Sequence, residues 1–128
     1  MPAALFRFSG LAWMFLAAAC ASPRGAALRA YERGDVASAR MQWQEQAERG
    51  DAEAQYLLAL SHDADEPLIA ADWYRRAAEQ GHAAAQSNLG LLVYAGRGSE
   101  RSFEEAARWF TLAAEQGFAP ARTNLGIC

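Results

Sequence analysis

The chain of 128 residues is long enough for one domain, and it combines 12 basic residues, all of them arginines, with 15 acidic residues for a formal net charge of −3 at pH 7. A phosphate-binding surface normally appears as a basic excess, so this balance argues against a nucleic-acid partner. Hydrophobic residues make up 52% of the chain, which is ample for a core and excludes the disordered class.

The N-terminal segment differs in kind from the rest of the chain. Arg7 precedes an apolar run that is too short for a typical membrane span, and small residues follow, as in a secretory signal peptide. The run ends in "LAAAC", which resembles the lipobox of bacterial lipoproteins. This resemblance implies that residues 1–19 are removed and that Cys20 becomes a lipidated N-terminus. Two alternatives stay open: ordinary cleavage after Ala19 or Ala21, and retention of the segment as an inner-membrane anchor.

The residue after the cysteine bears on the location of the protein. Because Ala21 rather than Asp follows Cys20, the resemblance implies an exported lipoprotein on the periplasmic side of the envelope, anchored in the outer membrane of a Gram-negative cell.

We interpret the rest of the chain as a short linker, 20–25, followed by one helical domain, 26–128. Apolar residues recur at three- and four-residue spacing, which is typical of helices that bury one face. We expect about seven helical segments, at 26–33, 35–49, 51–61, 67–80, 82–95, 103–116 and within 118–128.

Helix starts and stops are marked locally. Pro67 suits a first helical position, where its missing N–H has no partner to lose. Ser102 is an expected N-cap, and Glu105 three residues later is expected to complete a capping box. Glycines follow four of the segments, where a left-handed cap is expected: Gly34, Gly50, Gly81 and Gly117.

The chain repeats one phrase three times, as "AERGDAEAQYLLA", "AEQGHAAAQSNLG" and "AEQGFAPARTNLG". Aligned on Gly50, Gly81 and Gly117, the copies recur every 31 to 36 residues. Each helix pair is too small to bury its own apolar face, so the pairs are expected to stack into a solenoid. The expected units are 26–50, 51–81, 82–117 and a partial unit, 118–128.

One position within the repeat predicts a close helix crossing. It holds Ala59, Gly90 and Gly126 in the three copies. Glycine inside a helix costs about 1 kcal/mol relative to alanine, so its recurrence indicates that another helix approaches closely there.

The third unit carries small residues, a Leu-Gly pair, a tyrosine, a glycine loop and a tryptophan at fixed spacing: Ala85, Leu89, Gly90, Tyr94, Gly96 or Gly98, Ala106, Trp109, Ala113, Ala114 and Gly117. This combination resembles the Sel-one-like repeat (SLR), a relative of the tetratricopeptide repeat. The resemblance implies an all-α fold, an α/α repeat solenoid with a right-handed superhelix. It also implies repeat-structural roles for Trp73, Leu89, Gly90, Tyr94, Gly98, Trp109, Ala114 and Gly117. The second unit departs from the pattern, because "SHDADEP" replaces its glycine loop.

SLR proteins are mostly adaptors, so the resemblance implies a non-enzymatic protein–protein interaction module of the bacterial cell envelope. Partner-binding candidates on the rigid scaffold are Arg75, Arg76, Arg97 and Arg108. The alternative is an envelope glycan- or peptidoglycan-associated binding protein or enzyme.

Motifs for other chemistry are missing from the sequence. No catalytic motif or phosphate loop occurs, the two histidines have no evident partner, and no cofactor is expected. The acidic stretch 62–66 lacks the glycine of a calcium loop, so we interpret it as a solvated turn rather than a metal site. Aromatic residues that recur in register, such as Tyr74 and Phe110, are interpreted as repeat core rather than as a ligand-stacking stripe.

The end of the chain predicts an open docking edge. The sequence stops at Cys128, two residues after Gly126, without a polar capping helix. We expect another protein or a second copy to cover this edge, with a Cys128–Cys128 bridge in an oxidising compartment. The alternative is that residues 118–127 cover the preceding helix alone.

Overall fold

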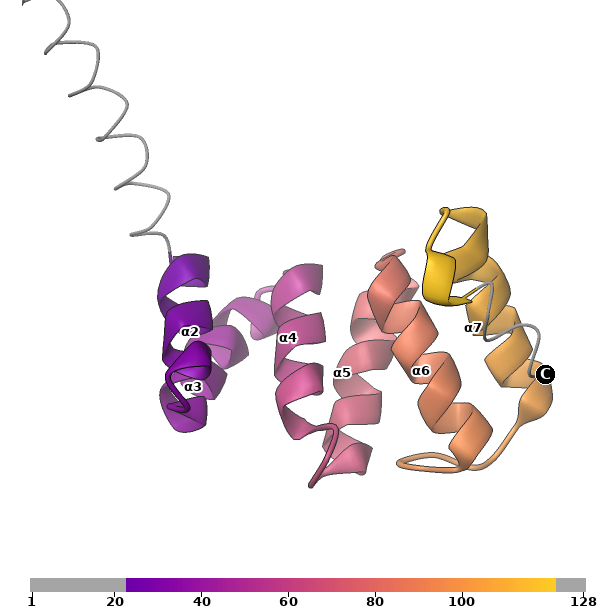
Figure 1. The fold of residues 1–128 in the computed structure, drawn as a ribbon, viewed down its shortest axis with the longest axis horizontal. Helices are drawn as coiled ribbons and strands as arrows, with labels where there is room; N and C mark the ends of the chain where they lie inside the picture. The colour runs from indigo at the N-terminus through magenta and orange to yellow at the C-terminus, as the bar shows by residue number, and fades with distance from the viewer. Residues whose placement is uncertain (1–22, 122–128) are drawn as a thin grey trace, which may run out of the picture. The chain divides into compact units, whose positions relative to one another are not determined.

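The computed structural model describes residues 23–121, and within this range every regular element is a helix. The helices are α2 (Pro23–Glu32), α3 (Val36–Glu48), α4 (Ala52–His62), α5 (Pro67–Glu79), α6 (Ala83–Ala95) and α7 (Phe103–Glu115) (Figure 1). Residues 119–121 are also helical. The predicted all-α repeat architecture is confirmed.

Helix α2 begins earlier than the sequence suggested. It starts at Pro23 and so occupies part of the expected linker, 20–25. Proline fits the first turn of a helix because the N–H that it lacks would have no partner there. The helix continues through Arg24 and Gly25 into Ala26, Ala27 and Leu28.

The chain divides into two compact units, 1–42 and 43–128, whose boundary falls inside α3. In the first unit, Ala27, Ala30 and Ala39 are buried. The turn after α2 ends at Asp35, whose side chain accepts the Ser38 backbone N–H at 3.2 Å and so caps the start of α3.

The second unit holds helices α4 to α7, which pack in sequence: α4 on α5, α5 on α6, and α6 on α7. In Figure 1, α4 and α6 lie nearer the viewer and α5 and α7 lie behind them. The largest fully buried side chains of this unit come from α3, α4, α5, α6 and α7 and include Trp43, Leu58, Tyr74, Leu89 and Phe110. The core is therefore a continuous seam between successive helices.

The predicted left-handed glycines are confirmed, since Gly34, Gly50, Gly81 and Gly117 all have positive φ. Gly98 has a second constraint. Its φ is +73°, and a Cβ there would overlap the Pro67 carbonyl oxygen. The loop after α6 thus lies directly against the first turn of α5, which only a residue without a side chain permits.

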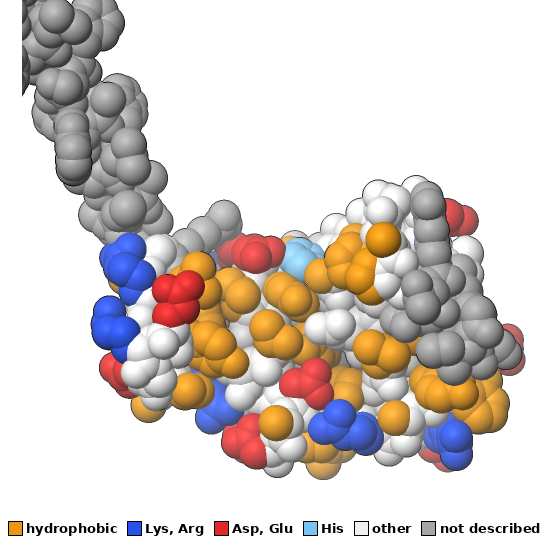
Figure 2. Space-filling view, viewed as in Figure 1, with side chains coloured by type: hydrophobic (Ala, Val, Ile, Leu, Met, Phe, Trp, Pro, Cys, Tyr) orange, Lys and Arg blue, Asp and Glu red, His pale blue; other side chains and the backbone are white. Residues whose placement is uncertain are grey.

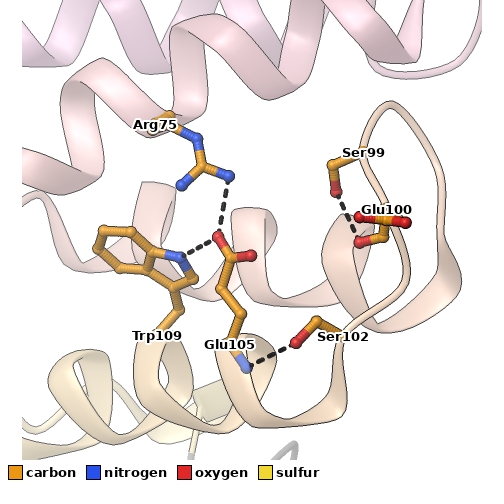
Figure 3. Close-up of polar contacts among 6 residues, drawn as sticks. All are labelled: Arg75, Ser99, Glu100, Ser102, Glu105 and Trp109. Carbon is orange, nitrogen blue, oxygen red and sulfur yellow. Dashed lines mark hydrogen bonds and ion pairs between the residues drawn. The ribbon is translucent and has the colours of Figure 1, made fainter.

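The capping box expected at the start of α7 forms only in part. The Ser102 Oγ accepts the Glu105 backbone N–H at 3.1 Å, as an N-cap does (Figure 3). The Glu105 carboxylate does not return to Ser102. It accepts from Arg75 instead, because a guanidinium is a stronger partner than a neutral N–H. The Ser102 N–H donates to the Val93 carbonyl at 3.3 Å.

Buried glutamines connect one repeat to the next. The Gln55 amide donates to the Ala47 carbonyl at 3.0 Å, and its oxygen accepts from Gln80 at 2.8 Å. The same arrangement recurs in the following repeat with Gln86, Ala78 and Gln116 at 3.1 and 2.9 Å. Gln55 and Gln86 are each only 4% exposed, so these bonds satisfy amides that burial would otherwise penalise.

The predicted close crossing at Gly90 is confirmed. A Cβ at this position would lie 2.5 Å from Cε1 and 2.7 Å from Cδ1 of the Phe110 ring. Phe110 is 1% exposed, so its ring is enclosed by the close-packed core. The contact sets how closely α6 and α7 approach.

We therefore expect Gly90→Leu to destabilise the protein by roughly 1–3 kcal/mol, because the new side chain overpacks the crossing. Urea unfolding of the purified variant measures the change. Ala95→Leu, at an exposed position of the same helix, is the control and should stay close to wild type. Equal unfolding midpoints for Gly90→Leu and wild type would show that this contact does not limit the approach of the helices.

Candidate functional site

A groove runs along the C-terminal half of α6 and reaches the turn after α4. Its volume is about 330 Å³. It is lined by Asp63, Asn88, Leu91, Leu92, Tyr94, Ala95 and Arg97. Figure 2 shows the face presented by α4 and α6, where hydrophobic side chains spread over both helices and charged side chains lie near the upper and lower edges.

Two exposed leucines give this face its apolar character. Leu60 on α4 is 39% exposed and Leu91 on α6 is 43% exposed. They occupy equivalent positions in successive repeats, so the repeat itself places an apolar side chain at regular intervals along this face. The recurrence of an exposed leucine on one face marks that face as a candidate interaction surface.

A hydrogen-bonded cluster lies beneath one end of the groove. The Tyr74 hydroxyl donates to Asp63 Oδ2 at 2.9 Å and accepts from Asn88 Nδ2 at 3.2 Å. Arg97 donates to the Asp63 carbonyl at 2.7 Å, and its second nitrogen lies 3.5 Å from Asp63 Oδ1. The turn after α4, helices α5 and α6 and the loop after α6 are thus tied together at one point.

Burial raises the pKa of Tyr74 far above its ordinary value, and the negative charge of Asp63 acts in the same direction. The pKa of Tyr56 is also raised, first by burial and then by the charge of Glu53. Both hydroxyls therefore keep their protons to higher pH than an ordinary tyrosine does, and they act as hydrogen-bonding groups.

The sequence analysis did not predict this cluster. It treated Asp63 as part of a solvated turn and Tyr74 as a core aromatic. The available signal was the hydroxyl, because the equivalent position in the next repeat holds Phe110, which has none. A tyrosine where a phenylalanine suffices for packing indicates a polar partner.

The histidines do have partners, contrary to the sequence interpretation. His82 is the N-cap of α6: its Nδ1 accepts the Ala85 N–H at 3.1 Å, and its Nε2 donates to Glu53 Oε2 at 2.6 Å. Its ring also stacks on Tyr56, with centroids 4.7 Å apart. His62 Nδ1 lies 3.0 Å from Glu66 Oε1. The two histidines serve separate local contacts.

The four arginines proposed as partner contacts lie in different settings. Arg97 belongs to the cluster with Asp63. Arg76 lies over the Trp73 ring, 4.6 Å from its centroid. Arg75 pairs with Glu105, and Arg108 is exposed on α7.

The repeat-structural residues also separate by environment. Trp73, Leu89 and Gly90 are buried. Tyr94, Gly98, Trp109 and Ala114 are half-buried, and Gly117 is exposed in a turn. Tyr94 lines the groove, and its ring centroid is 5.0 Å from that of Phe103.

Several sequence predictions fall outside the described residues. These are the signal segment, Cys20, and the C-terminal residues Leu125, Gly126 and Cys128. Within the part of the chain that the structure describes, no three His, Cys, Asp or Glu side chains come together as metal ligands would. In the same residues no helix has the length and hydropathy of a membrane span.

Replacing Tyr74 with Phe should remove the cluster's central hydroxyl. We expect a loss of about 1 kcal/mol at neutral pH, the usual net contribution of a hydrogen bond. The pH dependence should change as well. The raised pKa means that, above about pH 10, unfolded Tyr74 ionises while the folded residue keeps its proton, so stability falls as pH rises.

Urea unfolding between about pH 8 and 11 measures this effect. The wild type should lose stability more steeply than Tyr74→Phe above about pH 10, with a difference in slope of up to about 1.4 kcal/mol per pH unit. Tyr31→Phe, at an exposed tyrosine, is the control variant. Parallel curves for wild type and Tyr74→Phe would contradict the assignment.

The repeat architecture matches a known family profile. The Sel1 repeat profile matches residues 52–82 and 83–118, which together make up just over half of the chain. No curated protein matches the chain.

Two solved structures are similar over 70% of this chain. One is a Sel1 repeat protein from Oxalobacter formigenes, with 36% identity and a TM-score of 0.66. The other is a protective antigen present in uropathogenic Escherichia coli strains that displays an SLR fold, with 38% identity and a TM-score of 0.67. The match spans 38% of the first protein and 21% of the second. The repeat units, the alternating helices and these matches agree, and the chain therefore belongs to the Sel1 repeat family, whose members are generally protein-interaction modules.

Proposed function

We propose that this protein is a non-enzymatic adaptor of the bacterial cell envelope that binds a segment of a partner protein in the groove along α6 and the turn after α4. The observation that carries the proposal is the groove itself, in which the exposed Leu91 lies beside the hydrogen-bonding groups of Asn88 and Arg97. Apolar side chains of a partner would pack on Leu91, and the polar groups would fix the register of its backbone.

The support beneath the groove favours binding. Tyr74 and Arg97 hold Asp63 from two sides, so the wall of the groove is fixed before any partner arrives. A preformed surface loses less conformational entropy on binding than one that must first be ordered. Membership of a family of interaction modules is consistent with this use.

The envelope location is proposed from the N-terminal sequence. A basic start, an apolar run and "LAAAC" favour export and lipidation at Cys20, which would anchor the repeat domain on the periplasmic face of the outer membrane. Both of the solved structures described above come from bacterial proteins, which fits a bacterial lipoprotein pathway.

Metabolic labelling with a radioactive fatty acid tests the anchor. The wild-type chain should incorporate label and partition with membranes, and Cys20→Ser should do neither, because no other residue supplies the acylated thiol at that point. Mass spectrometry of the mature N-terminus independently identifies its first residue and any attached lipid. A soluble, unlabelled product beginning at Ser22 would contradict the lipoprotein proposal.

The adaptor function is tested by cross-linking in intact envelopes followed by purification of the tagged protein. We expect one stoichiometric protein partner with wild type and its loss with Leu91→Glu, which places a charge in the groove. Leu68→Glu is the matched control, because Leu68 is 70% exposed on α5 and does not line the groove. Retention on purified peptidoglycan or polysaccharide with no protein partner would favour the glycan-binding alternative.

A further inference from the structure

A second hollow lies between α5 and α7, in the helical layer that does not carry the groove. Its volume is about 210 Å³. It is lined by Arg75, Glu105, Arg108, Trp109 and Leu112. Figure 3 shows the polar part of its wall, where Arg75 of α5 and Trp109 of α7 both point toward the Glu105 carboxylate.

The carboxylate in this hollow is already bound within the protein. Glu105 Oε1 accepts from Arg75 Nη2 at 2.9 Å and from Trp109 Nε1 at 3.3 Å. Burial acts to raise the pKa of Glu105, but these two hydrogen bonds and the charges of Arg75 and Arg108 outweigh it and lower the pKa. Glu105 is therefore ionised at neutral pH, and it balances one of the two guanidinium groups.

The remaining hydrogen-bonding capacity is mostly that of a donor. A guanidinium has five N–H groups, and Arg75 uses one of them on Glu105. Arg108 donates no hydrogen bond to a side chain or backbone group that the structure describes. The lining of this hollow therefore holds two guanidinium groups and one carboxylate, and Glu104 carries a further negative charge in the adjoining hollow on α7. Within this hollow the unused N–H donors of Arg75 and Arg108 favour a ligand that supplies acceptors and negative charge.

The apolar part of the hollow is specific to the third repeat. In the second repeat, Arg76 covers the ring of Trp73. The equivalent pair in the third repeat is Leu112 and Trp109, and here Leu112 is 43% exposed and the tryptophan is half-buried. One substitution at a repeat position thus leaves an aromatic ring and an aliphatic side chain beside the arginines.

A further hollow adjoins this one along α7. Leu112 and Arg108 also line a larger hollow of about 460 Å³ together with Glu104, Ala107 and Thr111. The two hollows share these side chains as a common ridge. A ligand that crosses the ridge would contact several residues in succession, which suits a peptide segment better than a small ion.

We propose that the hollow between α5 and α7 is a second docking site, and that it binds an acidic peptide segment of a partner protein. A Glu or Asp side chain of the segment pairs with Arg108 and the unused donors of Arg75, and a neighbouring aliphatic side chain packs on Trp109 and Leu112. The site is separate from the groove along α6 and does not depend on what the groove binds.

The test uses the full chain, labelled with ¹⁵N, and three blocked peptides of equal length. These are Gly-Leu-Glu-Glu-Leu-Gly, the same peptide with two glutamines, and the same peptide with two arginines. The readout is the indole N–H resonance of Trp109, identified by its disappearance in Trp109→Phe. We expect the glutamate peptide to shift this resonance in a saturable way, with weaker binding as NaCl rises from about 50 to 500 mM. The glutamine and arginine peptides should give little or no shift.

Two variants locate the interaction. Arg108→Gln should weaken binding of the glutamate peptide about fivefold, which corresponds to about 1 kcal/mol. Arg76→Gln removes an arginine of the same helical layer from the ring of Trp73 and should leave the affinity unchanged. Leu91→Glu, in the groove, should also bind as wild type. Equal binding of the glutamate and glutamine peptides, tighter binding of the arginine peptide, or no effect of Arg108→Gln would overturn the proposal.

Discussion

The close approach of α6 to α7 at Gly90 is the constraint on which both surfaces depend. The Phe110 ring occupies the space that a Cβ at Gly90 would need, so the two helices lie closer than any other residue would permit. Helix α6 carries most of the groove, and α7 carries most of the second hollow. A wider crossing would move Leu91 and Trp109 relative to the residues that complete each surface. The missing side chain therefore sets the geometry on both sides of the same helix pair.

Buried hydrogen bonds fix the register of the packed helices, which apolar packing alone does not determine. Apolar contacts are non-directional, whereas the amides of Gln55 and Gln86 are satisfied only when each helix presents a particular carbonyl. The Tyr74 hydroxyl adds a similar requirement, since it bridges Asp63 and Asn88. These ties favour one rotation of each helix about its axis. Rigidity of this kind is what an interaction scaffold needs, because a partner then meets a surface that is already formed.

The pattern shared by the repeats and the residue differences between them determine different features of this structure. The repeat supplies the alternating helices, the glycine turns and the buried seam. Single differences between equivalent positions then create distinct surfaces: Tyr74 against Phe110 yields the cluster under the groove, and Arg76 against Leu112 uncovers Trp109. Glu105, at the position of Ile69, adds the ion pair with Arg75. A scaffold built in this way acquires a second binding surface without changing its core.

The sequence by itself determined the helices, their order and the repeat family, because these follow from local signals: glycines at the turns, Pro67 and Ser102 at helix starts, and a phrase that recurs in register. It also indicated the close crossing at Gly90. Only the tertiary structure decided the partners of the polar side chains. Glu105 has a capping role available three residues away, yet it binds Arg75, which is 30 residues distant. His82 and Asp63 likewise find partners on other helices. Such choices depend on the rotation and separation of packed helices, which arise from the sum of many core contacts and are not encoded in any short stretch of chain.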